Sequence, residues 1–163
     1  MKKRLLSGLS ALFLLLWAAA CSVPEPDPQW KLYFPAAAFD EGPALGSEAL
    51  DVESPPSQEE LILALLSGPS VDTLYSPFPK GVSLRSWYTQ DGILHINLSE
   101  QYGGLSGMAL TLADYSITLT LCQLPGVEGV SIIVENDPMA FRYHQILTPE
   151  DVLLTDLAAD EAE

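Results

Sequence analysis

The fold of this chain depends on residues 108–124, the stretch MALTLADYSITLTLCQL. Its apolar residues fall at every second position in two runs, 108–112 and 117–121, and its threonines also favour a strand. The stretch is longer than a usual strand, and Pro125-Gly126 ends it as a helix would end. The period-two pattern keeps a strand open, but we favour a largely buried helix. Its helical stripe runs through Met108, Leu112, Tyr115, Leu119 and Cys122.

The segment before it, VSLRSWYTQDGILHINL at residues 82–98, predicts a β-hairpin. Apolar and polar residues alternate on both sides of Asp91-Gly92, and Asp-Gly is a strong signal for a two-residue hairpin turn. Other strands are expected at residues 30–34 and 129–135, with a short one within 45–52. Residues 141–146 are a further candidate, as a hairpin partner of the strand at 129–135.

A second helix is predicted to begin after Ser57. Ser57 can accept hydrogen bonds from the free backbone amides of the first turn, and Glu60, three residues later, completes a capping box. Gly68 and Pro69 then end the helix.

The first twenty residues resemble a lipoprotein signal peptide. Three basic residues precede an apolar run, and Ala18-Ala19-Ala20 places small residues directly before Cys21. Cys21 is therefore the predicted lipid-attachment site, and it would carry a thioether-linked diacylglycerol. The alternatives are an ordinary secretory signal cut after Ala20 and an uncleaved anchor. The predicted layout is a signal peptide at 1–20, a proline-rich tether at 21–29, one domain at 30–154 and an acidic tail at 155–163.

The chain is strongly acidic, with 22 acidic and 7 basic residues and a formal charge of −15. Removing the leader with its three basic residues takes this charge from −15 to −18. Nucleic acid is excluded as a partner, since its phosphates require a basic patch. Anionic lipid would also repel the folded domain, so the predicted membrane contact is the lipid anchor alone.

No catalytic, cofactor-binding or metal-binding motif stands out. The chain has two histidines, His95 and His144. Ser99, Asp91 and Asp114 are the candidate residues that would act with them in a hydrolase, but the sequence has no Gly-x-Ser-x-Gly elbow. His95 is better read as a histidine on a sheet face, and Cys122, among leucines, as a buried structural thiol. No glycine-rich phosphate loop or dense metal spacing is present. We therefore predict a protein that is not an enzyme and has no cofactor.

Aromatic residues gather around the predicted hairpin and the loop before it. Phe78, Trp87 and Tyr88 are candidate anchors for a protein partner, because aromatic residues dominate the binding energy of many interfaces. Core packing is the alternative explanation for them.

Five segments together resemble the GerMN family of sporulation and spore-germination domains, over roughly residues 30–135. The resemblance rests on their order and spacing, and the segments are 32–34 (LYF), 65–69 (LLSGP), 76–82 (SPFPKGV), 97–99 (NLS), and 117–121 (ITLTL) running on through 124–127 (LPGV) to the strand at 130–134.

This resemblance implies an α+β fold, with a small mixed β-sheet and two helices packed on one face, similar to ring-building motifs of secretion assemblies. It also implies a non-catalytic role in sporulation or germination. The leading hypothesis is a lipid-anchored scaffold or assembly factor on the extracytoplasmic face of the bacterial cell membrane, with an envelope protein as partner and a homo-oligomer left open. The alternative is an envelope lipoprotein that binds a solute, a peptide or a glycan, for which a deep pocket would be the sign.

Overall fold

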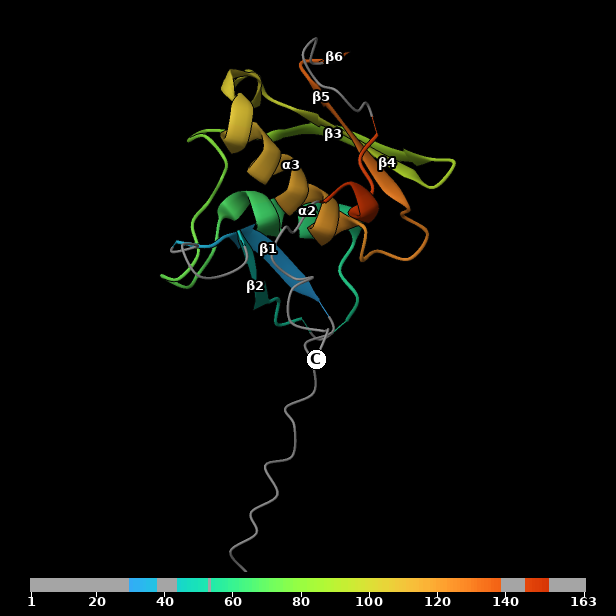
Figure 1. Ribbon diagram of the computed structural model, residues 1–163. Coiled ribbons are helices and arrows are strands. Elements are labelled where there is room, and N and C mark those ends of the chain that lie inside the picture. Colours follow the sequence, from blue (N-terminus) through green and yellow to red (C-terminus); the bar gives the residue numbers. More distant parts are fainter. Residues whose placement is uncertain (1–29, 38–43, 53, 139–145, 153–163) are drawn as a thin grey trace, which may run out of the picture.

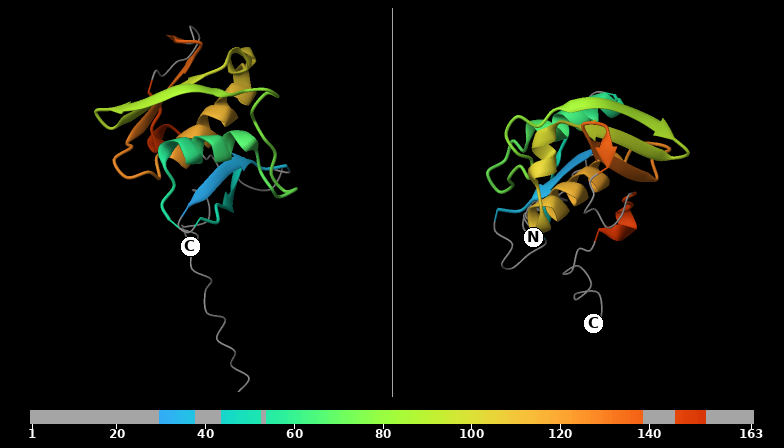
Figure 2. Two further views of the ribbon diagram at one scale, coloured as in Figure 1. Left: turned by 180° about the vertical axis from the view of Figure 1, so that it is seen from behind. Right: turned by 90° about the horizontal axis from the view of Figure 1, so that it is seen from above.

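A computed structural model describes residues 30–37, 44–52, 54–138 and 146–152 of the chain (Figure 1). A four-stranded sheet and a two-stranded sheet enclose two helices, α2 (Gln58–Ser67) and α3 (Gly107–Leu121). Each helix contacts the first strand of the small sheet and one strand of the large sheet, so the helices form a middle layer (Figures 1 and 2). The α+β class and the two helices on one face of a mixed sheet are confirmed.

The four-stranded sheet has the order β3–β4–β5–β6. Its strands are β3 (Leu84–Gln90), β4 (Ile93–Leu98), β5 (Gly129–Val134) and β6 (Asp137–Pro138). The β3–β4 and β5–β6 pairs are antiparallel, whereas β4 and β5 are parallel. The connection between these parallel strands contains the short 3-10 helix η1 (Glu100–Gly104) and α3, and a second 3-10 helix, η2 (Pro149–Asp151), follows β6. The sheet is therefore mixed, as expected.

Both tight turns of this sheet use backbone with positive φ. Asp91 and Gly92 between β3 and β4 have φ of 52° and 79°, and Glu135 and Asn136 between β5 and β6 have φ of 48° and 70°. Positive φ at both central positions matches the twist of a hairpin, and Asp-Gly supplies it at low cost. The Glu135–Asn136 turn has no glycine and is held by the Asn97 side chain. Asn97 Oδ1 accepts from Asn136 N at 3.0 Å, and Asn97 Nδ2 donates to Asn136 Oδ1 at 3.0 Å.

Helix α2 begins with the predicted capping box. The Ser57 hydroxyl accepts from Glu60 N, while Glu60 Oε2 accepts from Ser57 N at 2.8 Å. These hydrogen bonds to the charged carboxylate lower the pKa of Glu60 below its ordinary value. Gly68, with φ of 85°, ends the helix as predicted.

Residues 107–121 form helix α3, which confirms the helical prediction over the alternative strand. Nine of its fifteen residues are buried, and four of these are polar, in two pairs one helical turn apart: Asp114 with Thr118, and Ser116 with Thr120. A helix in contact with elements on several sides is apolar around most of its circumference, so its sequence lacks a clear polar face. This explains why its leucines also fit an alternating pattern.

The small sheet pairs β1 (Lys31–Pro35) with β2 (Leu45–Ala49) in antiparallel register. On the other edge of β1, backbone groups form hydrogen bonds with two side chains, Thr120 of α3 and Gln123 just after it. Thr120 Oγ1 accepts from Tyr33 N at 3.0 Å, and Gln123 Oε1 accepts from Lys31 N at 3.0 Å. Gln123 Nε2 also donates to Lys31 O at 2.7 Å. A helix therefore closes an edge that would otherwise be open to further strands.

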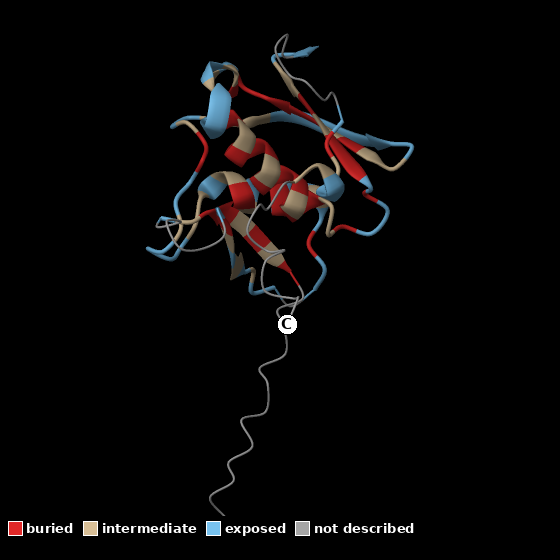
Figure 3. Cartoon of the chain, in the orientation of Figure 1, coloured by how far each residue is buried: buried red, intermediate tan, exposed pale blue. Residues whose placement is uncertain are grey.

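One hydrophobic core joins the layers. It includes Phe34 from β1, Leu61 and Leu65 from α2, and Ile96 from β4, all buried. Figure 3 shows the buried residues concentrated on the helices, β1, β4 and β5. The predicted strand at 141–146 lies largely outside the described residues. Within them, β5 pairs with β4 and β6, and Val130 also forms an isolated bridge with Leu147.

Candidate partner-binding surface

Strand β3 is an edge strand whose residues are almost all exposed. It pairs with β4 on one side only, and each residue from Arg85 to Gln90 is exposed, whereas β4 is mostly buried. Figure 3 shows this contrast along the hairpin. Natural proteins usually cover or shorten an edge strand because its free backbone groups can pair with another chain. β3, with seven residues, is the longest strand in the described part of the protein.

Two of the three predicted anchor residues lie on β3. Trp87 is 36% exposed, and Tyr88 is 54% exposed. Because side chains alternate along a strand, they point to opposite faces of the sheet. Tyr88 stacks on its cross-strand neighbour His95, with ring centroids 4.5 Å apart and an interplanar angle of 10°. Trp87 pairs with buried Ile96 and so belongs to the helix side of the sheet.

Phe78, the third predicted anchor, lies in the core. It is 9% exposed, and its ring packs against that of buried Tyr102 with centroids 6.5 Å apart. Its backbone N donates to Ser76 Oγ at 3.3 Å, which fixes the loop that carries the ring inward. The prediction of Phe78 as a surface anchor is therefore corrected, because its aromatic ring fills the core beneath η1. Pattern alone did not separate it from the exposed aromatics.

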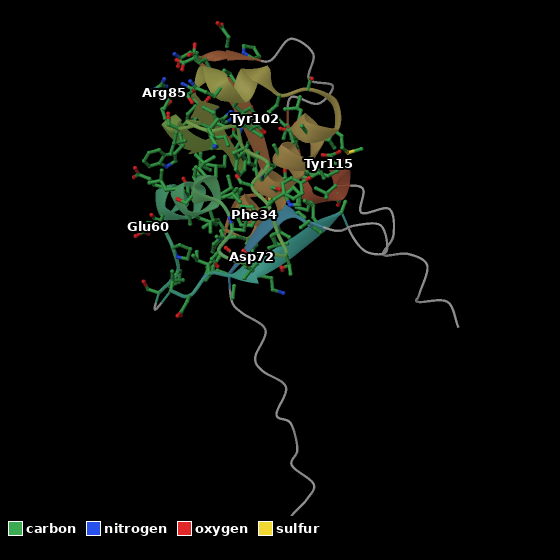
Figure 4. The ribbon with its side chains drawn as sticks, turned by 90° about the vertical axis from the view of Figure 1, so that its left-hand side faces the viewer. Phe34, Glu60, Asp72, Arg85, Tyr102 and Tyr115 are labelled. Carbon is green, nitrogen blue, oxygen red and sulfur yellow. The ribbon has the colours of Figure 1, made fainter. Side chains whose placement is uncertain are left out.

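The start of β3 is attached to the β5–β6 turn. Arg85 Nε donates to Glu135 Oε1 at 3.0 Å, and the same oxygen accepts from Glu100 N at 3.2 Å. Arg85 and Glu135 are each about half exposed, and Figure 4 shows Arg85 at the periphery of the molecule. Exposed ion pairs contribute little to stability. The Arg85–Glu135 pair holds the Arg85 side chain in place at the start of β3.

The end of β3 touches helix α2. Gln58 Nε2 donates to Thr89 Oγ1 at 2.8 Å, and Gln90 Nε2 donates to Asp91 Oδ2 at 3.3 Å. These exposed contacts leave the backbone of the strand uncovered in the described part of the chain. The sequence did not predict the contact between Gln58 and Thr89, because these residues are 31 positions apart and no local pattern joins them.

The candidate hydrolase residues are not brought together. His95 lies on the sheet face that carries Tyr88, opposite the helices, whereas Asp114 is buried on α3 and accepts from Tyr102 Oη at 2.7 Å. Ser99 Oγ accepts from Ser83 N at 2.9 Å, next to the hairpin. His144 lies outside the described residues. Figure 4 shows Tyr102 inside the molecule, where its hydroxyl joins η1 to α3.

Cys122 follows α3 and is partly buried, less than predicted. Within the described residues it is a free cysteine. Burial raises the pKa of its thiol from 9.0 to about 11. A thiol with a raised pKa is a poor nucleophile at neutral pH, which agrees with a structural role. The predicted acylation site, Cys21, lies outside the described residues, as do the leader and the tether.

A shallow pocket of about 340 Å³ lies between the end of β2 and α2. Its walls are mostly apolar, from Leu50, Val52, Ser54, Pro56, Glu60 and Ala64. The one charged group, Glu60, is already bound to Ser57. The pocket therefore lacks the converging polar groups that orient a small ligand.

The described residues also lack two other features. Within those ranges, no helix is long and apolar enough to cross a membrane. Among the same residues, no three histidine, cysteine or acidic side chains are grouped so as to hold a metal ion.

Comparisons with known proteins agree on the fold. The first GerMN domain of the sporulation protein GerM from Bacillus subtilis superposes with a TM-score of 0.58 and 15% identity, covering 75% of this chain and 98% of that one. The tandem GerMN domains of the same protein give a TM-score of 0.54 and 22% identity, covering 73% of this chain. This chain spans 43% of the length of the tandem protein.

At the sequence level, no curated protein matches the chain significantly. Residues 31–140 do match the family called Germane, described as sporulation and spore germination. That match runs from β1 to just beyond β6 and so includes both sheets and both helices. The chain therefore belongs to the sporulation and spore germination family, as its sequence segments predicted.

Proposed function

We propose that this protein is a lipid-anchored, non-catalytic scaffold that binds another envelope protein on the extracytoplasmic face of the membrane during sporulation or germination. Its family supports a role in those processes. The proposed anchor is Cys21, after a leader with a basic start, an apolar run and small residues before the cysteine. The proposed binding surface is strand β3 with Trp87 and Tyr88.

The exposed strand β3 is the observation that carries this proposal. An aromatic pair on an uncovered edge strand combines side-chain anchors with free backbone groups, and both are common means of protein recognition. The arrangement of His95, Ser99 and Asp114 offers no nucleophile with an adjacent base, which argues for binding over catalysis.

The test compares Tyr88→Glu and Trp87→Glu with a control, Val71→Glu. Val71 is 42% exposed and lies beside β2, where its neighbour Ser70 bonds to Glu48, away from the large sheet. Each variant is crosslinked in sporulating cells, and the partner recovered with the wild-type chain is quantified.

We expect the β3 variants to reduce partner recovery more than about tenfold, as loss of a central interface residue does. The Val71 variant should recover the partner as the wild type does, and circular dichroism should show all three variants folded. Undiminished recovery with both folded β3 variants would contradict the proposed surface.

A further inference from the structure

Within the part of the chain that the structure describes, the outer edge of β3 has a row of backbone groups without a hydrogen-bond partner. Gln90 and Ile93 flank a two-residue turn, so Gln90, Tyr88 and Ser86 direct their backbone groups toward β4. Trp87 and Thr89 must then direct theirs outward. The opposite side of β4 agrees with this alternation, because the oxygens of Gly92 and Leu98 accept from the segment that contains β5.

These outward groups have no hydrogen-bond partner among the described residues. The contact nearest to them is the one from Gln58 to the Thr89 side chain, and it leaves the Thr89 backbone untouched. Trp87 and Thr89 together offer two N–H donors and two C=O acceptors, spaced as an antiparallel strand requires. The other sheet edge that α3 faces is closed by Thr120 and Gln123, so β3 differs from β1 in being left open.

The charges around β3 identify the kind of strand that fits. β3 contains Arg85 and no acid, within a chain of net charge −15. Acidic residues flank both ends of the strand: Asp91 and Glu128 at the hairpin turn, and Glu100 and Glu135 near Arg85. Arg85 neutralises one of these, Glu135. An apolar strand with basic residues at its ends would therefore meet opposite charges at both ends, whereas a second copy of this acidic chain would be repelled.

We propose that β3 binds an extended, basic-flanked segment of the envelope partner, which adds to the large sheet as an antiparallel strand beside Trp87 and Thr89. This inference rests on the proposed function and specifies its partner. The backbone pairing would give affinity, and the flanking charges would give selectivity. Trp87 would pack against the side chains of the added strand on the helix side of the sheet.

The test uses three synthetic peptides and the full chain in detergent micelles. The first peptide alternates valine and threonine with a lysine at each end. The second replaces both lysines with glutamate, and the third carries an N-methyl group on every amide between its lysines, so that neither of its edges can donate hydrogen bonds to β3. Binding is followed by NMR of the backbone amides of Trp87 and Thr89.

We expect the basic peptide to shift these two amides most and to slow their hydrogen exchange. The acidic and N-methylated peptides should bind at least about tenfold more weakly, since one loses charge complementarity and the other loses hydrogen bonds. Raising the salt concentration should weaken the binding of the basic peptide, because salt screens the attraction between its lysines and the acidic residues around β3. Equal binding of the basic and N-methylated peptides, or of the basic and acidic peptides, would overturn the proposal.

Two protein variants complete the experiment. Thr89→Pro removes the outward N–H without removing a bond to β4, and proline is tolerated at such edge positions. It should abolish peptide binding, while Thr89→Val, which keeps the N–H, should bind as the wild type does. If Thr89→Pro fails to fold, the N-methylated peptide decides the question with unaltered protein.

A second copy as the occupant is tested by sedimentation of the chain alone. Self-association that Thr89→Pro abolishes would assign the edge to a homo-oligomer and overturn the proposal. Because these peptides replace the envelope partner, a negative result here rejects strand addition alone. The proposed function fails separately, if Tyr88→Glu and Trp87→Glu leave partner recovery unchanged.

Discussion

The Cys122 thiol reports how tightly the end of α3 is packed. Burial raises its pKa from 9.0 to about 11, because the charged thiolate loses solvation. At pH 8 the native thiolate fraction should be about 100-fold smaller than in the unfolded chain, so iodoacetamide should label native Cys122 far more slowly. In a Cys21→Ser background, the native labelling rate should rise with pH to a midpoint near 11.

The same shift fixes the sign of a pH effect on stability. The folded-state pKa lies above the unfolded value, so the contribution of the neutral thiol is complete below pH 9.0 and is lost as pH rises toward about 11. Cys122→Ala should remove that part of the alkaline decline in stability. A native labelling midpoint near 9 would show that the thiol is as solvated as in the unfolded chain.

At the scale of elements, one buried hydroxyl of α3 accepts a hydrogen bond from the backbone of β1. Thr120 is buried, and its Oγ1 accepts from Tyr33 N at 3.0 Å. Thr120→Val keeps the shape but leaves that donor without an acceptor, which should cost about 1–3 kcal/mol in the free energy of unfolding. Chemical denaturation of the variant and the wild type measures this difference.

Thr111→Val is the matched control within the same helix. The Thr111 hydroxyl donates to Gly107 O of its own helix, at an exposed position. Its loss strands no backbone donor, so the free energy of unfolding should change by less than about 0.5 kcal/mol. Equal destabilisation by the two substitutions would show that the hydroxyl of Thr120 does not support β1.

Local signals in the sequence were sufficient for most elements. The capping box at Ser57, the Asp91-Gly92 turn and the stop at Gly68 each act through neighbouring residues, and each predicted its structure. The closure of β1 by Thr120 and Gln123 joins residues about 90 positions apart, so no local pattern announces it. Phe78 was misplaced for the same reason, since its partner Tyr102 is distant in sequence.

The sequence predicted which hairpin carries the candidate surface, but not which of its two strands lies at the edge of the sheet. Alternation and the Asp-Gly turn located the hairpin, and its aromatic residues marked it as a candidate contact region. Which of its strands lies at the sheet edge depends on the parallel pairing of β4 with β5 across α3. That pairing is a property of the tertiary structure, so the open backbone of Trp87 and Thr89 could not be inferred from the hairpin sequence.

For the whole molecule, the negative charge and the proposed lipid anchor act on membrane binding in opposite directions. The chain without its leader has a formal charge of −18, lower than −15 by the three basic residues removed. An anionic membrane repels such a domain, so the proposed attachment rests on the lipid of Cys21. Each buried methylene contributes about 0.8 kcal/mol, and two acyl chains suffice for stable anchoring.

Cys21→Ser should therefore abolish membrane attachment through lipid. Cells are labelled with radioactive fatty acid, and the protein is partitioned between detergent and aqueous phases. The wild type should carry label and enter the detergent phase, whereas Cys21→Ser should carry none and either enter the aqueous phase or keep its leader. Cys122→Ser is the control, because it removes the other cysteine and should leave label and partition unchanged. Label that persists in Cys21→Ser and disappears in Cys122→Ser would contradict Cys21 as the anchor and place the lipid on Cys122, which follows α3.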